Sequence, residues 1–401
     1  MSIVVMKEIS YSLKNTVYEC FEKIGGIQNF LNSGDTVLIK PNFVGPIESE
    51  QGATTNTELV AILAEIAIQN GAKQVYVAES SATCFSTNDV VEKLHLEQAL
   101  KKSKNGRIQF VDLDAEETVK VNAPSDFFLK EIPIPKLLKK VDRIWNVPKA
   151  KVHYVDAITC AVKNYVGFLP REFRLQVHQS RLSHVVAVMH KLFPESLVLA
   201  DATVIGEGEG PLNVCPIQFG YLAISDDPVA LDAVIGKIFG FQPQEIEFAM
   251  NAFNMGIGDI NPLCLFDMSN VDAFGIGHGF KRPVKGIVGR YKPFRIILGG
   301  ACYGCLTWMK GTLEGWILDG TMNELEKTGI KISVMVGYNA TDERFDEFVQ
   351  NPYVVLGDCV PEKYKNDPRV IHAPGCCPGE KIPSALEKAI SVAMKMKKQN
   401  G

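Results

Sequence analysis

The stretch Thr36-Val-Leu-Ile-Lys40, followed later by Gln74-Val-Tyr-Val-Ala-Glu79, decides the fold class of this chain. Both are short apolar runs that contain β-branched residues, which is typical of buried strands. Between them, residues 57–70 have the apolar spacing of a helix, Asn56 is placed to cap it and Gly71 to end it. A strand, a helix and a second strand of this length form a βαβ unit, which predicts a parallel sheet.

The same alternation continues along the rest of the chain. Further strands are predicted at 143–146, 197–201, 295–298, 331–336, 353–356 and 369–372, and helices at 227–239 and 383–398. We therefore predict an α/β protein with two domains. The N-terminal domain, residues 1–275, has a mostly parallel sheet and an insertion at about 102–140. A linker at 276–293 leads to a smaller, flavodoxin-like α/β domain at 294–401.

Composition narrows the class of protein. The 401 residues carry 42 Lys+Arg and 46 Asp+Glu, a net charge of −4, and 46% are hydrophobic. This balance is typical of a globular protein and does not favour nucleic-acid binding. There is no signal-like apolar run at the N-terminus and no run that approaches the roughly 18 residues of a membrane span. We expect a cytoplasmic protein that binds neither nucleic acid nor membrane, and we make no prediction of oligomeric state.

Cysteine placement is the most informative feature of the C-terminal domain. Five of the ten cysteines lie in the last hundred residues, each after a predicted strand: Cys302, Cys305, Cys359, Cys376 and Cys377. Loops at the carboxyl ends of parallel strands converge at one edge of the sheet, so the thiols are expected to converge too. Four thiolates suit a 4Fe–4S cluster. They also suit zinc, although zinc ribbons usually carry two CxxC pairs and this region has one.

The motifs around these cysteines resemble a known module. Cys302-Tyr-Gly-Cys305, Gly357-Asp-Cys359 and Pro374-Gly-Cys-Cys-Pro378 are similar to the proximal-cluster module of nickel–iron hydrogenase small subunits and to the related cluster subunit of respiratory complex I. The resemblance implies a 4Fe–4S cluster bound by Cys302, Cys305, Cys359 and Cys376. Cys377 stands where that family has proline, which makes Cys377 the alternative fourth ligand. A redox partner protein would follow from such a cluster.

A second set of motifs follows the predicted strands of the N-terminal domain. They are Lys40-Pro-Asn42, Pro148-Lys-Ala-Lys-Val-His153, Lys163-Asn164, the predicted loop Glu207-Gly-Glu-Gly-Pro211, and Asp227-Pro-Val-Ala-Leu-Asp232. These motifs lie between residues 36 and 240, and they resemble the family named domain of unknown function 362 over about residues 36–275. The resemblance supports the architecture, and the family name assigns no reaction.

The residue types in these motifs suggest binding and proton transfer. Lysine and amide side chains that suit a small anionic substrate are Lys40, Asn42, Lys149, Lys151 and Asn164. Carboxylates that suit a divalent cation are Glu79, Asp201, Glu209 and Asp226. His153, Lys163 and Glu207 are the candidates for proton transfer, since burial shifts such pKa values toward neutrality. Any one of these residues is equally explained as a solvated surface group, and Asp227-Pro228 as a simple helix start.

Two interpretations of function therefore stay open. The first is a 4Fe–4S redox or electron-transfer protein, which as an enzyme would be an oxidoreductase that acts on a small anionic substrate in the N-terminal domain. The second is a non-redox metal-dependent enzyme or a ligand-sensing scaffold, with structural zinc or a structural cluster.

Overall fold

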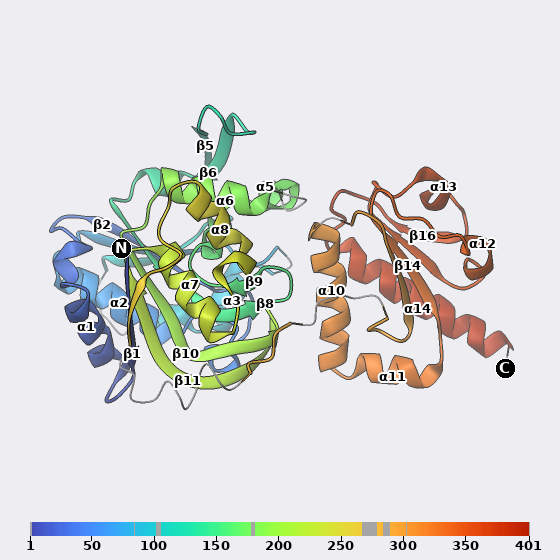
Figure 1. The fold of residues 1–401 in the computed structure, drawn as a ribbon, viewed down its shortest axis with the longest axis horizontal. Coiled ribbons are helices and arrows are strands. Elements are labelled where there is room, and N and C mark those ends of the chain that lie inside the picture. The colour runs from blue at the N-terminus through green and yellow to red at the C-terminus, as the bar shows by residue number, and fades with distance from the viewer. Residues whose placement is uncertain are drawn as a thin grey trace. The chain divides into compact units, whose positions relative to one another are not determined.

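The computed structural model describes residues 2–83, 85–101, 106–177, 181–266, 279–283, 289–301 and 303–400. The chain divides into two compact units, one of residues 1–174 and 182–283 and the other of residues 175–181 and 284–401. Both units are built from strands and helices in alternation, which confirms the predicted α/β class (Figure 1). Residues 276–278 and 284–288 of the predicted linker 276–293 fall outside the described residues.

One sheet forms the centre of the first unit. In the described residues it has ten strands in the order β12-β1-β11-β10-β7-β2-β3-β4, and β8 pairs with β10 and β9. The strands are β1 (Ile3–Glu8), β2 (Thr36–Pro41), β3 (Gln74–Glu79), β4 (Ile108–Asp112), β7 (Arg143–Val147), β8 (Lys149–His153), β9 (Ala157–Thr159), β10 (Leu197–Glu209), β11 (Asn213–Ser225) and β12 (Leu263–Phe266). Strands β10, β7, β2, β3 and β4 run parallel, as the βαβ pattern predicts.

Helices cover both faces of this sheet. They are α1 (Leu13–Lys23), α2 (Thr57–Gln69), α3 (Thr87–Lys93), α4 (Leu96–Lys101), α5 (Arg171–Val177), α6 (Leu182–Leu192), α7 (Pro228–Ile238) and α8 (Glu247–Asn254), with a 3₁₀ helix, η4, at Lys163–Phe168. Helices α1 to α4 share one apolar core with alternate residues of the strands. Helix α7 lies outside that core and packs against β1, β10 and β11 (Figure 1).

Helix α2 shows why the local prediction works. The Asn56 side chain accepts hydrogen bonds from the backbone N–H groups of Glu58 and Leu59, which would otherwise lack partners at the start of the helix. Gly71 has φ +101°, a conformation that glycine adopts without strain. Capping residues and apolar spacing therefore agree with the packing of the helix on the sheet.

Two segments of the first unit differ from the prediction. Residues 206–209, predicted as part of a loop, are the end of β10, which pairs along its length with antiparallel β11. Part of the predicted insertion 102–140 also joins the main sheet, since residues 108–112 form the edge strand β4 beside β3. The remainder includes a small two-stranded sheet of β5 (Thr118–Asn122) and β6 (Glu131–Pro135).

The second unit has a four-stranded parallel sheet in the order β13-β14-β15-β16. Its elements are β13 (Phe294–Leu298), β14 (Ile332–Val336), β15 (Tyr353–Leu356) and β16 (Val370–Ala373), with α10 (Tyr303–Leu318), α11 (Thr321–Thr328), α12 (Phe345–Phe348), α13 (Glu362–Lys365) and α14 (Lys381–Asn400). One apolar core joins α10, α11 and α14 to one face of the sheet, and a smaller core lies under α12 and α13. The strand order lacks the reversal that characterises flavodoxin-like sheets.

The first unit does have a reversal of strand order, at β2. Strands β3 and β4 lie on one side of β2, whereas β7 and β10, which come later in the chain, lie on the other side. In open parallel sheets, ligands bind outside the carboxyl ends of the strands at such a switch point. Most of the polar motifs of the N-terminal half follow these strands.

Candidate functional site

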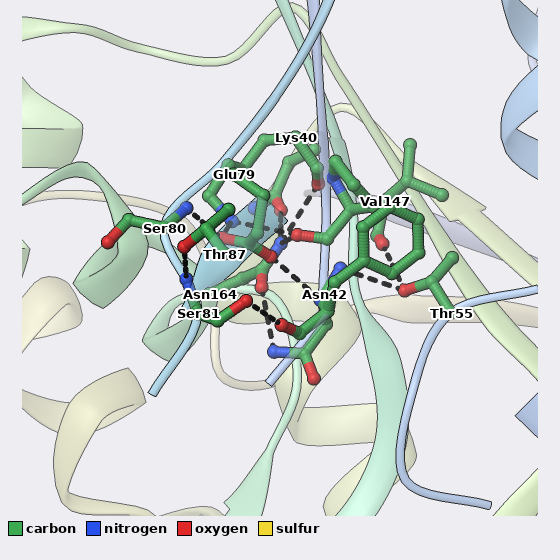
Figure 2. A network of polar contacts seen from close by, with 12 residues as sticks. Lys40, Asn42, Thr55, Glu79, Ser80, Ser81, Thr87, Val147 and Asn164 are labelled. Carbon is green, nitrogen blue, oxygen red and sulfur yellow. Dashed lines mark hydrogen bonds and ion pairs between the residues drawn. The ribbon is translucent and has the colours of Figure 1, made fainter. Parts of the chain in front are cut away.

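A buried ion pair joins the carboxyl ends of β2 and β3 (Figure 2). Lys40 Nζ pairs with Glu79 Oε1 and donates to the Pro41 carbonyl at 2.8 Å. The second oxygen, Glu79 Oε2, accepts the backbone N–H of Phe43 at 2.7 Å. Gly167 in η4 lies against the pair, because a Cβ at this position would be 2.6 Å from Glu79 Oε1 and 2.8 Å from Lys40 Nζ.

Amide side chains connect this pair to β7 and η4 (Figure 2). Asn164 Nδ2 donates to the Lys40 carbonyl at 3.0 Å and to Asn146 Oδ1 at 2.8 Å. Asn42 Nδ2 donates to Asn164 Oδ1 at 3.0 Å. The Asn42 backbone N–H donates to Thr55 Oγ1 at 2.9 Å, and Thr55 donates in turn to the Val147 carbonyl. These bonds fix the segment after β2 against the switch point.

A second buried ion pair, Lys149 with Asp201, links β8 to β10. Lys149 Nζ lies 2.9 Å from Asp201 Oδ2, and both side chains have no exposed surface. Asp201 Oδ2 also accepts the Asn56 N–H at 2.8 Å, and Oδ1 accepts both donors of Thr203. Each oxygen of the Asp201 carboxylate therefore accepts two hydrogen bonds. This carboxylate stabilises the fold and has no lone pair left for a cation.

Lys151 has different surroundings from the other lysines. Its side chain has no exposed surface, and Nζ donates to Asn42 Oδ1 at 2.9 Å and to the Ala53 carbonyl. Among the described residues, no carboxylate forms an ion pair with Lys151. Burial, followed by the nearby charges of Lys163 and Lys149, lowers the pKa of Lys151 well below its usual value.

The turn between β8 and β9 (Ala157–Thr159) brings together His153, Asp156 and Lys163. Lys163 Nζ pairs with Asp156 Oδ2, and His153 Nδ1 lies 3.3 Å from the same oxygen. The backbone N–H groups of Val155 and Asp156 both donate to His153 Nδ1 at 3.2 Å, which places the proton of a neutral ring on Nε2. Burial is the strongest influence on the pKa of Lys163 and lowers it, although Asp156 opposes this. Ala157 has φ +64°, a strained conformation for alanine.

The structure separates the other predicted residues from this group. Glu207 Oε2 accepts the backbone N–H of Lys281 at 2.7 Å, so Glu207 holds a later segment of the chain and not the lysine cluster. Asp226 is exposed, and Glu209 lies at the far end of β10. No group of three or more His, Cys, Asp or Glu side chains within the described ranges is arranged to hold a metal ion. The predicted divalent-cation set therefore does not assemble in these residues.

The predicted cluster ligands lie at the carboxyl edge of the second sheet. A Cβ on Gly357 would lie 3.6 Å from Cys305 Sγ and 3.7 Å from Cys359 Sγ, so both sulfurs flank the same glycine. The Asp358 N–H donates to the Gly375 carbonyl at 3.1 Å, which joins the loop of Cys359 to the loop that contains Cys376 and Cys377. Cys302 falls outside the described residues.

Three residues of the site were not predicted. Asp156 binds Lys163, Thr159 is the direct cross-strand neighbour of Lys151, and Gly167 makes room for Lys40 and Glu79. Asp156 could have been found from its position three residues after His153, because a short turn brings an acidic residue at this spacing back to the histidine. Thr159 and Gly167 stand in the motif that contains Lys163 and Asn164, but their roles depend on strand register and on close packing, which the motif does not show.

Charge is unbalanced in the lysine cluster. Lys40, Lys149 and Lys163 each bind a carboxylate, whereas among the described residues Lys151 binds only neutral oxygen atoms. A buried lysine without a carboxylate partner suits either an anionic ligand that compensates its charge or a neutral amine.

Comparison with known proteins places this arrangement in a family. Residues 37–237, half of the chain, match the family model described as "Domain of unknown function (DUF362)". The chain belongs to the DUF362 family. This match includes every lysine of the cluster, and it ends before residues 284–401 of the second unit. The resemblance of residues 294–401 to the hydrogenase module therefore stays a prediction.

Two individual proteins are also similar to the DUF362 chain. The thylakoid-associated protein sll1697 of Synechocystis sp. is 28% identical over 281 residues, which cover 67% of this chain and 84% of that protein. The structure of the lactate racemase apoprotein from Thermoanaerobacterium thermosaccharolyticum aligns with 98% of this chain and 90% of its own, at 11% identity and a TM-score of 0.39. Within the described part of the chain, no helix is both long enough and apolar enough to cross a membrane.

Proposed function

We propose that this protein is an iron–sulfur oxidoreductase. The second unit would hold a 4Fe–4S cluster, and the lysine cluster of the first unit would bind a small anionic substrate. The position of Cys305 and Cys359 beside Gly357 carries the proposal, because it brings a thiol from the first turn of α10 and a thiol from the loop after β15 to one point at the sheet edge. The alternative is a structural zinc or structural cluster in a non-redox protein.

The chemistry of the donor set, rather than an assembled group of thiols, supports an iron–sulfur cluster. Cys305, Cys359, Cys376 and Cys302 would supply the thiolates, with Cys377 as the alternative to Cys376. Gly357 and Gly375 both have positive φ and lack side chains, so backbone N–H groups can approach cluster sulfur atoms in this region. Bound there, the cluster would supply one-electron transfer.

The substrate side of the proposal rests on the lysine excess. Three lysines are neutralised by Glu79, Asp201 and Asp156, and these pairs position the polar groups around Lys151. His153 and Lys163 lie in the same β8–β9 region and are available to hold or move a proton near a bound anion. The chemistry supports a small carboxylate or a comparable anion.

Anaerobic purification tests the cluster directly. We expect brown protein with about four iron atoms per chain, whose visible absorption bleaches with dithionite. Cys305→Ser should lose the iron, whereas Cys20→Ser should keep it, and these two cysteines are matched because both are buried. Colourless protein with one zinc per chain would favour the structural alternative. Equal iron in the two variants would refute the ligand assignment.

The anion site has its own test. Lactate and pyruvate should raise the unfolding temperature of the first unit, because a ligand that binds only the folded state stabilises it. No change with either anion at millimolar concentration would remove the substrate part of the proposal and leave the cluster part standing.

A further inference from the structure

The hydrogen bonds of Lys151 match those of a neutral amine. A lysine ammonium has three N–H donors and no acceptor, whereas the neutral amine has two donors and one lone pair. Nζ of Lys151 has two acceptors, Asn42 Oδ1 and the Ala53 carbonyl. With both N–H groups satisfied, the lone pair remains. A third proton would be buried among the described residues without an acceptor, which is unfavourable.

The surroundings of Lys151 also activate an amine. Two conditions make a lysine nucleophilic at neutral pH: removal from water and proximity to another cationic group. Lys151 meets both, because its side chain is fully buried and the charges of Lys149 and Lys163 act on it. The same neighbouring charges attract a carboxylate. An amine of this kind recognises a carbonyl compound that is also an anion.

An unused hydroxyl lies beside Lys151. Thr159 pairs directly with Lys151 across the β8–β9 ladder, so the two side chains share one face of the sheet. Thr159 Oγ1 is buried and has no hydrogen-bond partner in the part of the chain that the structure describes. A buried hydroxyl without a partner is rare and points to a missing ligand group.

We propose that Lys151 is a nucleophile that forms an imine with small 2-oxo acids, and that Thr159 hydrogen-bonds the bound acid. This inference rests on the proposed function, since it names the substrate class of the same anion site. Asn42 is partly exposed and contacts Nζ, so the amine lies one side chain below the surface. Movement of the Asn42 amide would open the way to it.

The covalent step is balanced without any oxidant or reductant. The Nζ lone pair attacks the carbonyl carbon, and a C=N bond replaces the C=O bond. The two Nζ protons leave with the carbonyl oxygen as one water molecule. Hydrolysis is the reverse of this reaction and returns the free amine.

Reductive trapping tests the inference on the full-length, anaerobically purified protein. The protein is incubated at pH 7 with pyruvate and sodium cyanoborohydride, digested, and mapped by mass spectrometry. We expect the reduced adduct on Lys151 at least tenfold above that on Lys149, which is equally buried but paired with Asp201. At pH 7 an ordinary lysine is neutral in only about one molecule in 2,500, so exposed lysines such as Lys139 give the background.

Two controls separate the possible outcomes. Lys151→Arg removes the nucleophilic amine and should abolish trapping at this site, and Thr159→Val should reduce trapping several-fold. If lactate raises the unfolding temperature but pyruvate leaves no adduct on Lys151, the anion site stands and the imine is refuted. Equal labelling of Lys149 and Lys151 in the wild-type chain also refutes it, without the need for any variant to fold. If neither anion binds, the substrate part of the proposed function fails and the imine fails with it.

Discussion

Replacement of Gly167 by alanine should strongly destabilise the first unit. The added Cβ would lie 2.6 Å from Glu79 Oε1, 2.7 Å from Lys40 Cε and 2.8 Å from Lys40 Nζ. Side-chain exposure of this ion pair is only 1% and 4%, so neither partner has space to withdraw. Overpacking a core costs about 1–3 kcal/mol and breaking a buried ion pair about 3–5 kcal/mol. We expect a loss of about 3 kcal/mol in the free energy of unfolding.

Urea unfolding measures this loss if only the first unit is observed. The chain has three tryptophans, and Trp145 alone lies in the first unit, so Trp308→Phe and Trp316→Phe leave a single buried reporter. A loss of about 3 kcal/mol shifts the midpoint by about 1.5 M urea at an m-value of about 2 kcal/mol per M.

Gly106→Ala is the matched control. It adds the same methyl group in the same unit, and no atom of the described residues lies within 4 Å of that position. We expect a change of less than about 0.5 kcal/mol. Gly167 is outside the left-handed region, so backbone strain adds nothing to its effect. Equal stability of the Gly167→Ala and Gly106→Ala proteins would refute the close packing of η4 on the ion pair.

Further predictions concern the second unit and the β8–β10 contact. Asp342→Asn should lower the stability of the second unit by about 2–3 kcal/mol in urea, since the carboxylate accepts two Arg295 bonds at 2.6 and 2.7 Å and the Tyr353 hydroxyl at 2.8 Å. The Arg295 guanidinium holds the pKa of Asp342 below its usual value. The stability that this pair contributes is therefore present above about pH 4 and is lost as the pH falls. In a profile of stability against pH, Asp342→Asn should flatten this loss at acid pH. Gly210→Ala should leave the first unit largely unfolded by circular dichroism, because its Cβ would lie 1.9 Å from the Val152 carbonyl oxygen; a native spectrum would contradict that contact.

Much of the fold could be predicted because local and tertiary preferences agree. Strands β2 and β3 and helix α2 have apolar spacing, caps and burial that all indicate the same elements. The end of β10 could not be predicted, since its glycines favour a loop. Position 206 requires glycine, because a Cβ on this residue would lie 2.7 Å from the carbonyl oxygen of Gly52. Gly52 is far from residue 206 in the sequence, so the local sequence pattern does not predict this contact.

The lysine cluster could be predicted in outline but not in its pairings. Parallel strands bring their carboxyl ends to one edge, so residues that follow β2, β3 and β7 were expected to meet there. Which carboxylate binds which lysine depends on side-chain reach across the sheet. Asp156 therefore forms the ion pair with Lys163, whereas Glu207 accepts a hydrogen bond from the backbone N–H of Lys281.

The burial of Lys151 provides an amine for the site and lowers the free energy of unfolding of the first unit. In the unfolded chain this side chain is an ammonium ion in water, so a neutral amine in the folded chain requires that folding release a proton. Its lowered pKa in the folded chain means that the unfolded state binds more protons, and the first unit gains stability as the pH rises toward the ordinary lysine pKa. A methionine at this position would remove the penalty and give a more stable protein without the amine. Lys151 lowers the stability of the fold and yet stands at the edge of the sheet. A trade-off between activity and stability produces such a residue.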